Sequence, residues 1–266
     1  IMLRHLKQKY NQCQRDKSKW ENFLKPYFED TNYNDTDEVE RIIDDEVLSD
    51  LKDLGKTGNT INKYMSVITQ MFKRAKDRGV VNVIPDTPTQ QVIDKPRDPY
   101  ENKELNLINR QCEELYNDKK NIYFLESKDY FNVCRCGGFR PGLEVLNLKR
   151  KDVFYETDAK DPTYKILRFN VWGTKTKPKH SPVANSFFTQ KIFPEIINRH
   201  KDKGLTDDDY LLFPFEKNRK SLKNRTGKLF VDISKKLQLF YFKGGTRPLY
   251  AIRHTYATEL YKGGAS

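Results

Sequence analysis

The stretch TGNTINKYMSVITQMFKRAKDRGV, residues 57–80, determines how the chain divides. Its apolar residues recur three or four positions apart, the spacing that places side chains on one side of an α-helix: Ile61, Tyr64, Met65, Ile68, Phe72 and Ala75. Asn59 or Thr60 can cap the start of this helix, and Gly79 can end it in a left-handed conformation. The pattern therefore predicts one long amphipathic helix with a buried stripe.

Prolines follow this helix and indicate a domain boundary. They lie at positions 85, 88, 96 and 99, and such a density ends helices and favours an extended spacer. Upstream, residues 8–28 and 35–54 also have helical patterns. We therefore expect an all-α N-terminal domain over residues 1–92, a linker over 93–102 and a second domain over 103–266.

The second domain has a mixed pattern. Short runs rich in β-branched and aromatic residues, bounded by turn residues, predict strands at 153–155, 166–172 and 181–183, with a basic hairpin loop at 173–180. Helical patterns cover residues 102–116, 129–139, 190–199, 217–239 (whole or broken) and 249–261. The fold class expected from these elements is mainly α with a small antiparallel β-sheet, an α+β arrangement.

Charge favours a polyanionic partner. The 266 residues hold 49 Lys and Arg against 37 Asp and Glu, a net charge of +12, and mean hydropathy is −0.85. Residues 1–95 are neutral overall, so the whole excess lies in residues 96–266, while the stretch 29–53 is strongly acidic. This separation is typical of a protein with one face towards nucleic acid. The absence of an apolar run of 18 residues argues against a membrane span.

Several classes of site are missing from the sequence. It has no GxxxxGK phosphate loop, no GxGxxG and no GxSxG motif. Cys13, Cys112, Cys134 and Cys136 form no CxxC pair, so buried reduced thiols are expected rather than a metal site. Residues 207–209, Asp-Asp-Asp, are expected to form a solvated loop or a helix cap. We therefore expect neither a metal nor another cofactor.

Three basic segments remain. The first is Gly138-Phe139-Arg140-Pro141-Gly142 followed by Glu144, and the second is Thr174-Lys175-Thr176-Lys177 between two predicted strands. The third is Arg253-His254-Thr255-Tyr256-Ala257-Thr258, followed by Gly263-Gly264. In this order the segments resemble the first arginine box, the lysine hairpin and the second arginine box of the tyrosine recombinases, or phage integrases. The 60–80 helix resembles that family's core-binding domain.

The resemblance implies site-specific cleavage and rejoining of DNA strands through a 3′-phosphotyrosyl intermediate, without metal or ATP. Arg140 and Arg253 would hold the non-bridging phosphate oxygens, since a guanidinium binds two oxygens and stays protonated. Lys175 would be the general acid for the leaving 5′ oxygen, and Tyr250 would take the place of a usual histidine. The expected DNA-binding residues are the cations of the 57–80 helix and of the hairpin: Lys63, Lys73, Arg74, Lys177 and Lys179.

The chain also departs from the family pattern. The spacing from Arg140 to Glu144 is one residue longer than the family's R-x-x-E. The nucleophilic tyrosine is expected after Gly263-Gly264, so the resemblance implies a chain truncated before it and inactive in cleavage. Tyr256 and Tyr261 lie too close to Arg253 to match its position.

The implied partners are double-stranded DNA and, in the intact protein, three further copies in a synaptic tetramer, with no membrane. The implied source is a bacterial or phage mobile genetic element, and the implied location is the cytoplasm at the nucleoid. Two alternatives remain open: a catalytically inactive DNA-binding regulator of the same fold, and an enzyme related to type IB topoisomerases.

Overall fold

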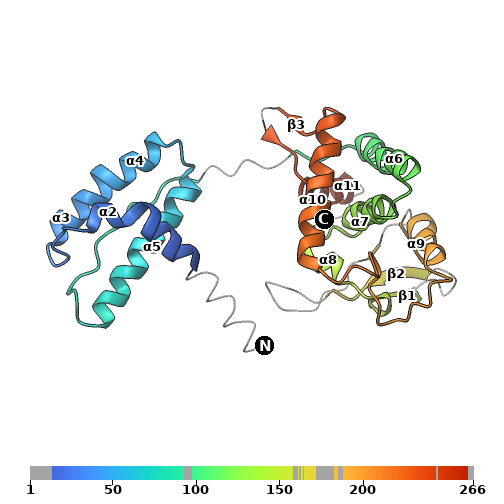
Figure 1. Ribbon diagram of the computed structural model, residues 1–266, viewed down its shortest axis with the longest axis horizontal. Helices are drawn as coiled ribbons and strands as arrows, with labels where there is room; N and C mark the ends of the chain where they lie inside the picture. Colours follow the sequence, from blue (N-terminus) through green and yellow to red (C-terminus); the bar gives the residue numbers. More distant parts are fainter. Residues whose placement is uncertain are drawn as a thin grey trace. The chain divides into compact units, whose positions relative to one another are not determined.

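A computed structural model describes residues 14–92, 98–157, 161, 163, 165–171, 183–184, 188–243 and 245–262. The chain forms two compact units, Ile1–Lys95 and Pro96–Ser266 (Figure 1). The division falls inside the segment 93–102 that was expected to be a linker. Tyr100, from the same segment, is buried in the core of the second unit.

The first unit is helical throughout its secondary structure. Helical residues 14–19 lead into the π-helical turn η1, Trp20–Leu24, and then into α2, Lys25–Phe28. A second helical run consists of α3, Thr36–Arg41, the π-helical η2, Ile42–Val47, and α4, Leu48–Asp53. The long helix α5, Gly58–Asp77, completes the unit. Both expected upstream helices are therefore confirmed where the chain is described.

The ends of α5 differ in detail from the expectation. Thr57, rather than Asn59 or Thr60, caps the helix, since its hydroxyl accepts a hydrogen bond from the backbone N–H of Thr60 at 3.4 Å. Gly79 has a φ of +70° and ends the helix in the left-handed conformation expected of it.

An extended segment, residues 81–92, returns along α5. The Asn62 side chain accepts a hydrogen bond from the backbone N–H of Gln90 at 2.8 Å and donates one to the Gln90 carbonyl at 2.9 Å. The hydroxyls of Thr69 and Thr87 lie 2.9 Å apart. The Asn62 bonds satisfy both backbone groups of Gln90, and the threonine pair adds a side-chain contact, in a segment that has no secondary structure of its own.

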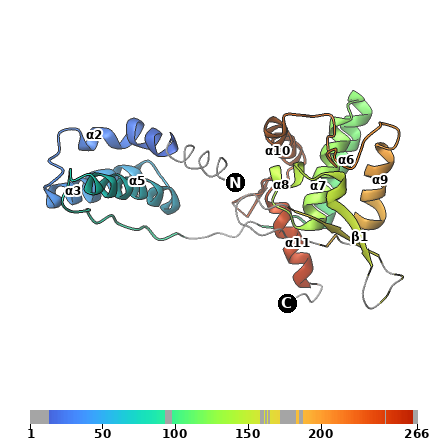
Figure 2. The same cartoon turned by 90° about the horizontal axis from the view of Figure 1, so that it is seen from below.

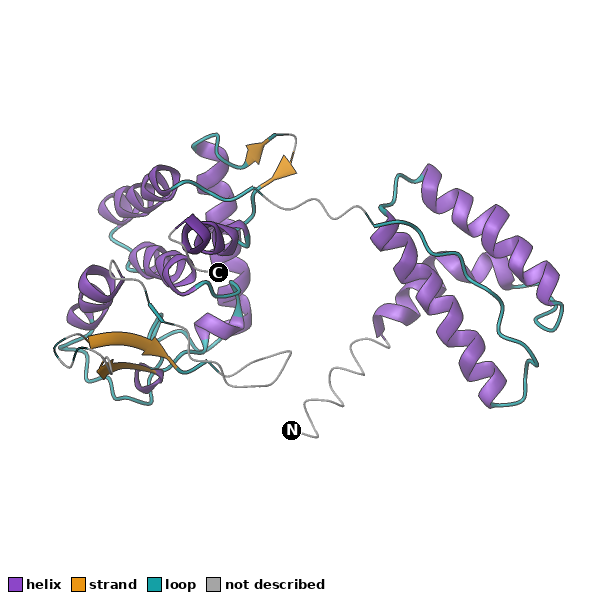
Figure 3. Cartoon of the chain, turned by 180° about the vertical axis from the view of Figure 1, so that it is seen from behind, coloured by secondary structure: helices purple, strands orange, loops and turns teal. Residues whose placement is uncertain are grey.

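The second unit is also mostly helical, with little sheet (Figures 2 and 3). Its elements in chain order are α6 Asn102–Lys119, α7 Tyr123–Gly137, α8 Leu143–Leu146, η3 Arg150–Asp152, β1 Val153–Thr157, β2 Lys165–Phe169, η4 Phe188–Ile192, α9 Phe193–Arg199, α10 Arg219–Lys236, β3 Tyr241–Phe242, β4 Gly245–Thr246 and α11 Ala251–Lys262. Strands β1 and β2 pair antiparallel, and β3 pairs antiparallel with β4. The expected α+β class is confirmed.

The local differences have physical causes. Helix α10 is continuous despite Gly227, because buried Leu222, Phe230 and Ile233 hold it on both sides of the glycine. Of the predicted third strand, 181–183, only Val183 is among the described residues, and it forms an isolated bridge with Arg168. The β3–β4 hairpin was not predicted, since two-residue strands leave no periodic signal.

Helix α7 is the centre of the second unit, and every residue from Glu126 to Gly137 is buried. Helix α6 packs along it, and the rings of Phe131 and Phe230 meet edge to face at 5.1 Å between α7 and α10. The thiols of Cys112, Cys134 and Cys136 are buried as expected, while Cys13 lies outside the described residues. Within the described parts of the chain, no helix is long and apolar enough to cross a membrane.

Candidate active site

The first arginine stands on a turn at the end of α7. Gly138 follows the helix with a φ of +62°, and Phe139 is buried with its ring 4.9 Å from that of Phe169 on β2. Phe139 anchors the turn in the core, and the next residue, Arg140, is exposed. Gly142 has a φ of +145° and starts α8, whose first turn contains Glu144. The extra residue between Arg140 and Glu144 is therefore accommodated by a glycine turn.

The second arginine stands in the first turn of α11. Ala251 and Ile252 are fully buried and fix the helix in the core, while Arg253 is half-buried at its edge. Tyr250 directly precedes the helix, and its ring lies 5.6 Å from the ring of His254. Among the described residues, no hydrogen bond or ion pair engages the guanidinium group of Arg140 or Arg253. Within the described chain, both cations are therefore available to an anion.

A close contact brings the two arginine segments together. The Tyr256 ring of α11 lies directly on Gly138, so that a Cβ added at Gly138 would be 2.3 Å from the Tyr256 Cδ1 atom. Gly138 is two residues before Arg140, and Tyr256 is three residues after Arg253. The site thus joins segments more than one hundred residues apart in the sequence. Burial raises the pKa of Tyr256, which keeps this phenol protonated in its packing role.

One basic residue near this site was not predicted. The side chain of Lys223 on α10 passes over Gly142, where an added Cβ would lie 3.5 Å from the lysine Cε atom. Lys223 is exposed and makes no ion pair within the described chain. In the sequence it is one of several lysines on a helix, and no local pattern distinguishes it.

The remaining predicted residues are not gathered at this site. Lys175, Lys177 and Lys179 lie outside the described residues. Lys63, Lys73 and Arg74 belong to the first unit, where all three are exposed on α5. None of these three makes an ion pair among the residues that the structure describes.

Other arginines that share the basic composition are structural. The guanidinium of Arg219, which is buried, donates hydrogen bonds to the carbonyls of Leu146, Phe213 and Leu212, among others, and lies 3.9 Å from the centre of the Tyr210 ring. Burial lowers its pKa to about 10. Arg199 pairs with buried Asp129, and Arg247 pairs with Glu104. Such groups orient elements of the fold and are closed to a ligand.

The described residues contain no cluster that would hold a metal ion. Asp208 is exposed and pairs with Lys149 at 3.1 Å and with Lys151, while Asp209 accepts the backbone N–H of Thr206 at 2.7 Å. The expected loop role of residues 207–209 is confirmed. Burial raises the pKa of Cys112 to about 12, so its thiol is unreactive at neutral pH.

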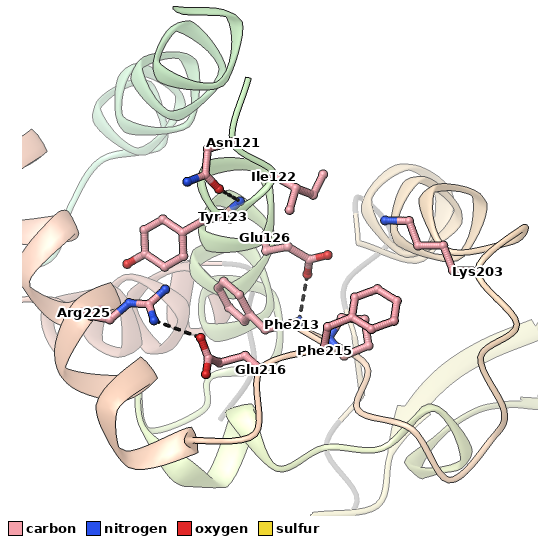
Figure 4. A pocket seen from close by; sticks show the side chains of 10 residues that line it. Asn121, Ile122, Tyr123, Glu126, Lys203, Phe213, Phe215, Glu216 and Arg225 are labelled. Carbon is pink, nitrogen blue, oxygen red and sulfur yellow. Dashed lines mark hydrogen bonds and ion pairs between the residues drawn. The ribbon is translucent and has the colours of Figure 1, made fainter. Parts of the chain in front are cut away.

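A pocket of about 250 Å³ opens at the other end of α7 (Figure 4). Its polar groups already have partners: Arg225 donates to Glu216 at 2.9 Å, and the carboxylate of Glu126 accepts the Phe213 N–H at 2.9 Å and contacts His200 at 2.7 Å. Tyr123, at the start of α7, is part of its wall, whereas Arg140 follows the end of that helix. Of the predicted site residues that the structure describes, none lines this pocket.

This chain is similar in fold to solved structures, although comparison of its sequence gives no match. No protein-family model matches the sequence, and no curated protein matches it. A lambda integrase dimer bound to a core site superposes with a TM-score of 0.64 at 16% identity, covering 94% of this chain and 82% of that one.

Two further structures agree with this match. The Tn1549 transposon integrase in complex with circular intermediate DNA has a TM-score of 0.58 at 17% identity, covering 95% of this chain and 82% of its own. The XerH site-specific recombinase bound to its difH substrate has a TM-score of 0.56 at 17% identity, covering 85% of this chain and 62% of its own. The chain therefore has the fold of the tyrosine recombinases and integrases, as its three basic segments indicated.

Proposed function

We propose that this protein is a site-specific DNA recombinase that cleaves and rejoins strands through a 3′-phosphotyrosyl intermediate. The observation that carries the proposal is the contact of Tyr256 with Gly138, which unites two arginine segments whose guanidinium groups have no partner among the described residues. The likeness to integrases and a recombinase solved on DNA supports it.

The arginines account for catalysis without a metal. Negative charge grows on the non-bridging oxygens as a phosphodiester is attacked, and fixed cations stabilise that charge. Arg140 is held by a buried neighbour and a glycine turn, and Arg253 by a buried helix start, so both backbones are fixed before DNA binds. Electrostatic stabilisation by such preorganised groups is usually the largest single contribution to enzymatic catalysis.

The other roles complete the proposal. Lys175 protonates the leaving 5′ oxygen, Tyr250 hydrogen-bonds the phosphate, and a tyrosine hydroxyl is the nucleophile. Lys63, Lys73 and Arg74, together with Lys177 and Lys179, contact the phosphates of double-stranded DNA. The assembly would be a homotetramer on two synapsed sites, acting at the nucleoid of a bacterium or phage-infected cell.

The decisive experiment traps the covalent intermediate. Duplexes selected from a random pool by binding to the full-length protein are rebuilt with a nick, so that the cleaved end diffuses away. We expect a covalent protein–DNA adduct without added metal. Arg253→Ala should lower the rate of adduct formation at least about 100-fold, since one lost donor to a transition-state oxyanion has that effect, while most DNA affinity persists through other phosphates.

A matched control uses Arg110, which is exposed on α6 and paired with Glu114 at 3.1 Å. Arg110→Ala removes the same charge and should cleave normally. No adduct on any selected site would overturn the enzyme proposal in favour of a DNA-binding regulator. Relaxation of any supercoiled plasmid, with no need of a selected site, would favour a topoisomerase.

A further inference from the structure

A buried hydroxyl joins α11 to the segment that leads into the second unit. The Thr255 Oγ1 atom accepts a hydrogen bond from the backbone N–H of Tyr100 at 2.9 Å and donates one to the backbone carbonyl of Tyr100 at 3.0 Å. Thr255 and Tyr100 are each 2% exposed, so water cannot replace either bond. One side chain thus satisfies both backbone groups of a residue 155 positions away.

The same tyrosine is held on its other side by Arg247. The Arg247 guanidinium lies 4.3 Å from the centre of the Tyr100 ring, and the Tyr100 hydroxyl donates to the Arg247 carbonyl. Arg247 also binds both carboxylate oxygens of Glu104 at 2.9 Å and the Pro99 carbonyl at 3.3 Å. Arg247, which is buried four residues before α11, therefore holds Pro99, Tyr100 and Glu104 together.

Two contacts by adjacent residues thus fix the position of α11: Thr255 binds Tyr100, and Tyr256 packs on Gly138. Thr255 is two residues after Arg253, and the next residue, Tyr256, packs on Gly138 of the first arginine segment. The Arg253 guanidinium has no partner of its own in the described chain, so its position depends on how the helix backbone is held. Loss of the two Thr255–Tyr100 hydrogen bonds would remove the attachment of α11 to Tyr100. It would also leave the buried backbone N–H and carbonyl of Tyr100 without these bonds.

We propose that Thr255 is a positioning residue for the cleavage reaction, which makes the placement of Arg253 depend on the seating of residues 99–100. This inference rests on the proposed recombinase function and names the device that sets its second arginine. Thr255 touches neither DNA nor the reacting atoms. Its effect is on the rate of the chemical step, because a misplacement of about 1 Å can slow catalysis about 100-fold.

The test separates the hydroxyl from the shape of the side chain. Thr255→Val keeps the volume and loses both hydrogen bonds, whereas Thr255→Ser keeps the hydroxyl. In the full-length protein on the nicked substrate, we expect Thr255→Val to lower the single-turnover cleavage rate about 100-fold with DNA affinity within about twofold, because the phosphate contacts remain. Thr255→Ser should restore most of the rate.

Two further variants keep the test decisive. Ser127→Ala removes another buried hydroxyl of the same unit, one that donates to the Tyr123 carbonyl at 2.8 Å within its own helix, and should leave the cleavage rate unchanged. If Thr255→Val does not fold, Tyr100→Phe loosens the same seat by removing the bond to the Arg247 carbonyl, and it should slow cleavage without loss of affinity.

The outcomes distinguish this inference from the proposed function. Normal cleavage by Thr255→Val, in a protein that Arg253→Ala inactivates, would overturn the positioning role alone. Equal loss of affinity and cleavage, or failure of Thr255→Ser to restore the rate, would also overturn it, since both indicate general damage. Normal cleavage by Arg253→Ala would instead contradict the proposed function.

Discussion

The two units of this chain are stabilised in different ways. In the first unit, the described residues that are fully buried are apolar, among them Leu24, Ile43, Leu51 and Ile68. The second unit has an apolar core of its own, but it also buries charged groups, including Glu126, Asp129, Arg219 and Arg247. A buried charge requires partners at fixed positions, whereas an apolar contact tolerates small shifts. The second unit therefore has the more exactly determined geometry.

This difference matches what each unit exposes. The first unit presents Lys63, Lys73 and Arg74 on a single helix, and flexible cations that grip a phosphate backbone need little preorganisation. The second unit presents Arg140 and Arg253 from separate segments, and the proposed catalysis would depend on their relative position. Buried polar clusters are found in the unit whose proposed task needs precise placement.

The largest stability effect is expected at the Arg247 cluster. Arg247→Met leaves the largely buried Glu104 carboxylate without its cation, which should cost about 3–5 kcal/mol in the free energy of unfolding of the second unit. Denaturant titration followed by peptide-resolved hydrogen exchange assigns the loss to a unit. Arg225→Met breaks a partly exposed pair with Glu216 and should cost less than about 1 kcal/mol. Equal losses would contradict the view that burial of the Arg247–Glu104 pair makes it important to the geometry of the second unit.

A packing change should dominate in the first unit. Ile68→Ala empties a fully buried site on α5 and should cost about 3 kcal/mol there, the typical range for such a truncation. Faster hydrogen exchange in peptides from residues 58–77 would report this loss. Gln70→Ala, on the exposed side of the same helix, is the control. An effect of Ile68→Ala that spread equally to peptides of the second unit would mean that the units do not unfold independently.

Acid should weaken the second unit through Glu104. Burial alone would raise the pKa of Glu104, but hydrogen bonds from Arg247 and from the Glu101 N–H, with the Arg247 charge, lower it below its usual value of 4.5. The stabilisation is then complete above that value and is lost as the pH falls through the lowered pKa.

The measurement is the difference in unfolding free energy between the natural protein and Glu104→Gln. It should be largest at neutral pH and should shrink on acidification. Asp129 acts in the opposite direction, because burial raises its pKa to about 6, but it is present in both proteins and cancels. A difference that did not change with pH would show that the carboxylate charge is not what holds the cluster.

The smallest effect is expected on the exposed face of α5. Lys73→Ala should reduce the steepness with which the logarithm of DNA affinity falls against the logarithm of salt concentration. The expected reduction in slope is about 0.9, the value for one phosphate contact. Lys52→Ala on α4, an exposed lysine within the acidic stretch, is the matched control and should leave the slope unchanged. Equal slopes for the two variants would remove α5 from the DNA-binding surface.

Much of the fold was predictable because it depends on local patterns. The apolar period of residues 61–75 indicated α5, and Gly79 marked its end because a positive φ favours glycine. The start of α7 was placed six residues too late, since polar Glu126, Ser127, Lys128 and Asp129 are buried there beside apolar residues, so no apolar period marks the first turns. The buried role of Arg247 was not predicted either, because its partners Glu104 and Tyr100 are more than one hundred residues away.

The sequence by itself determined the class of fold, and it predicted a linker over residues 93–102 and the two arginine segments, since each depends on residues close together in the chain. Only the tertiary structure decided which of the basic residues are available. It buried Arg219 and Arg247 among carbonyls and carboxylates, and left Arg140 and Arg253 without partners in the described chain. The physical reason is that groups distant in sequence decide whether a cation is paired. Tyr100 and Glu104 bind Arg247, whereas the contact of Tyr256 with Gly138 joins the two arginine segments.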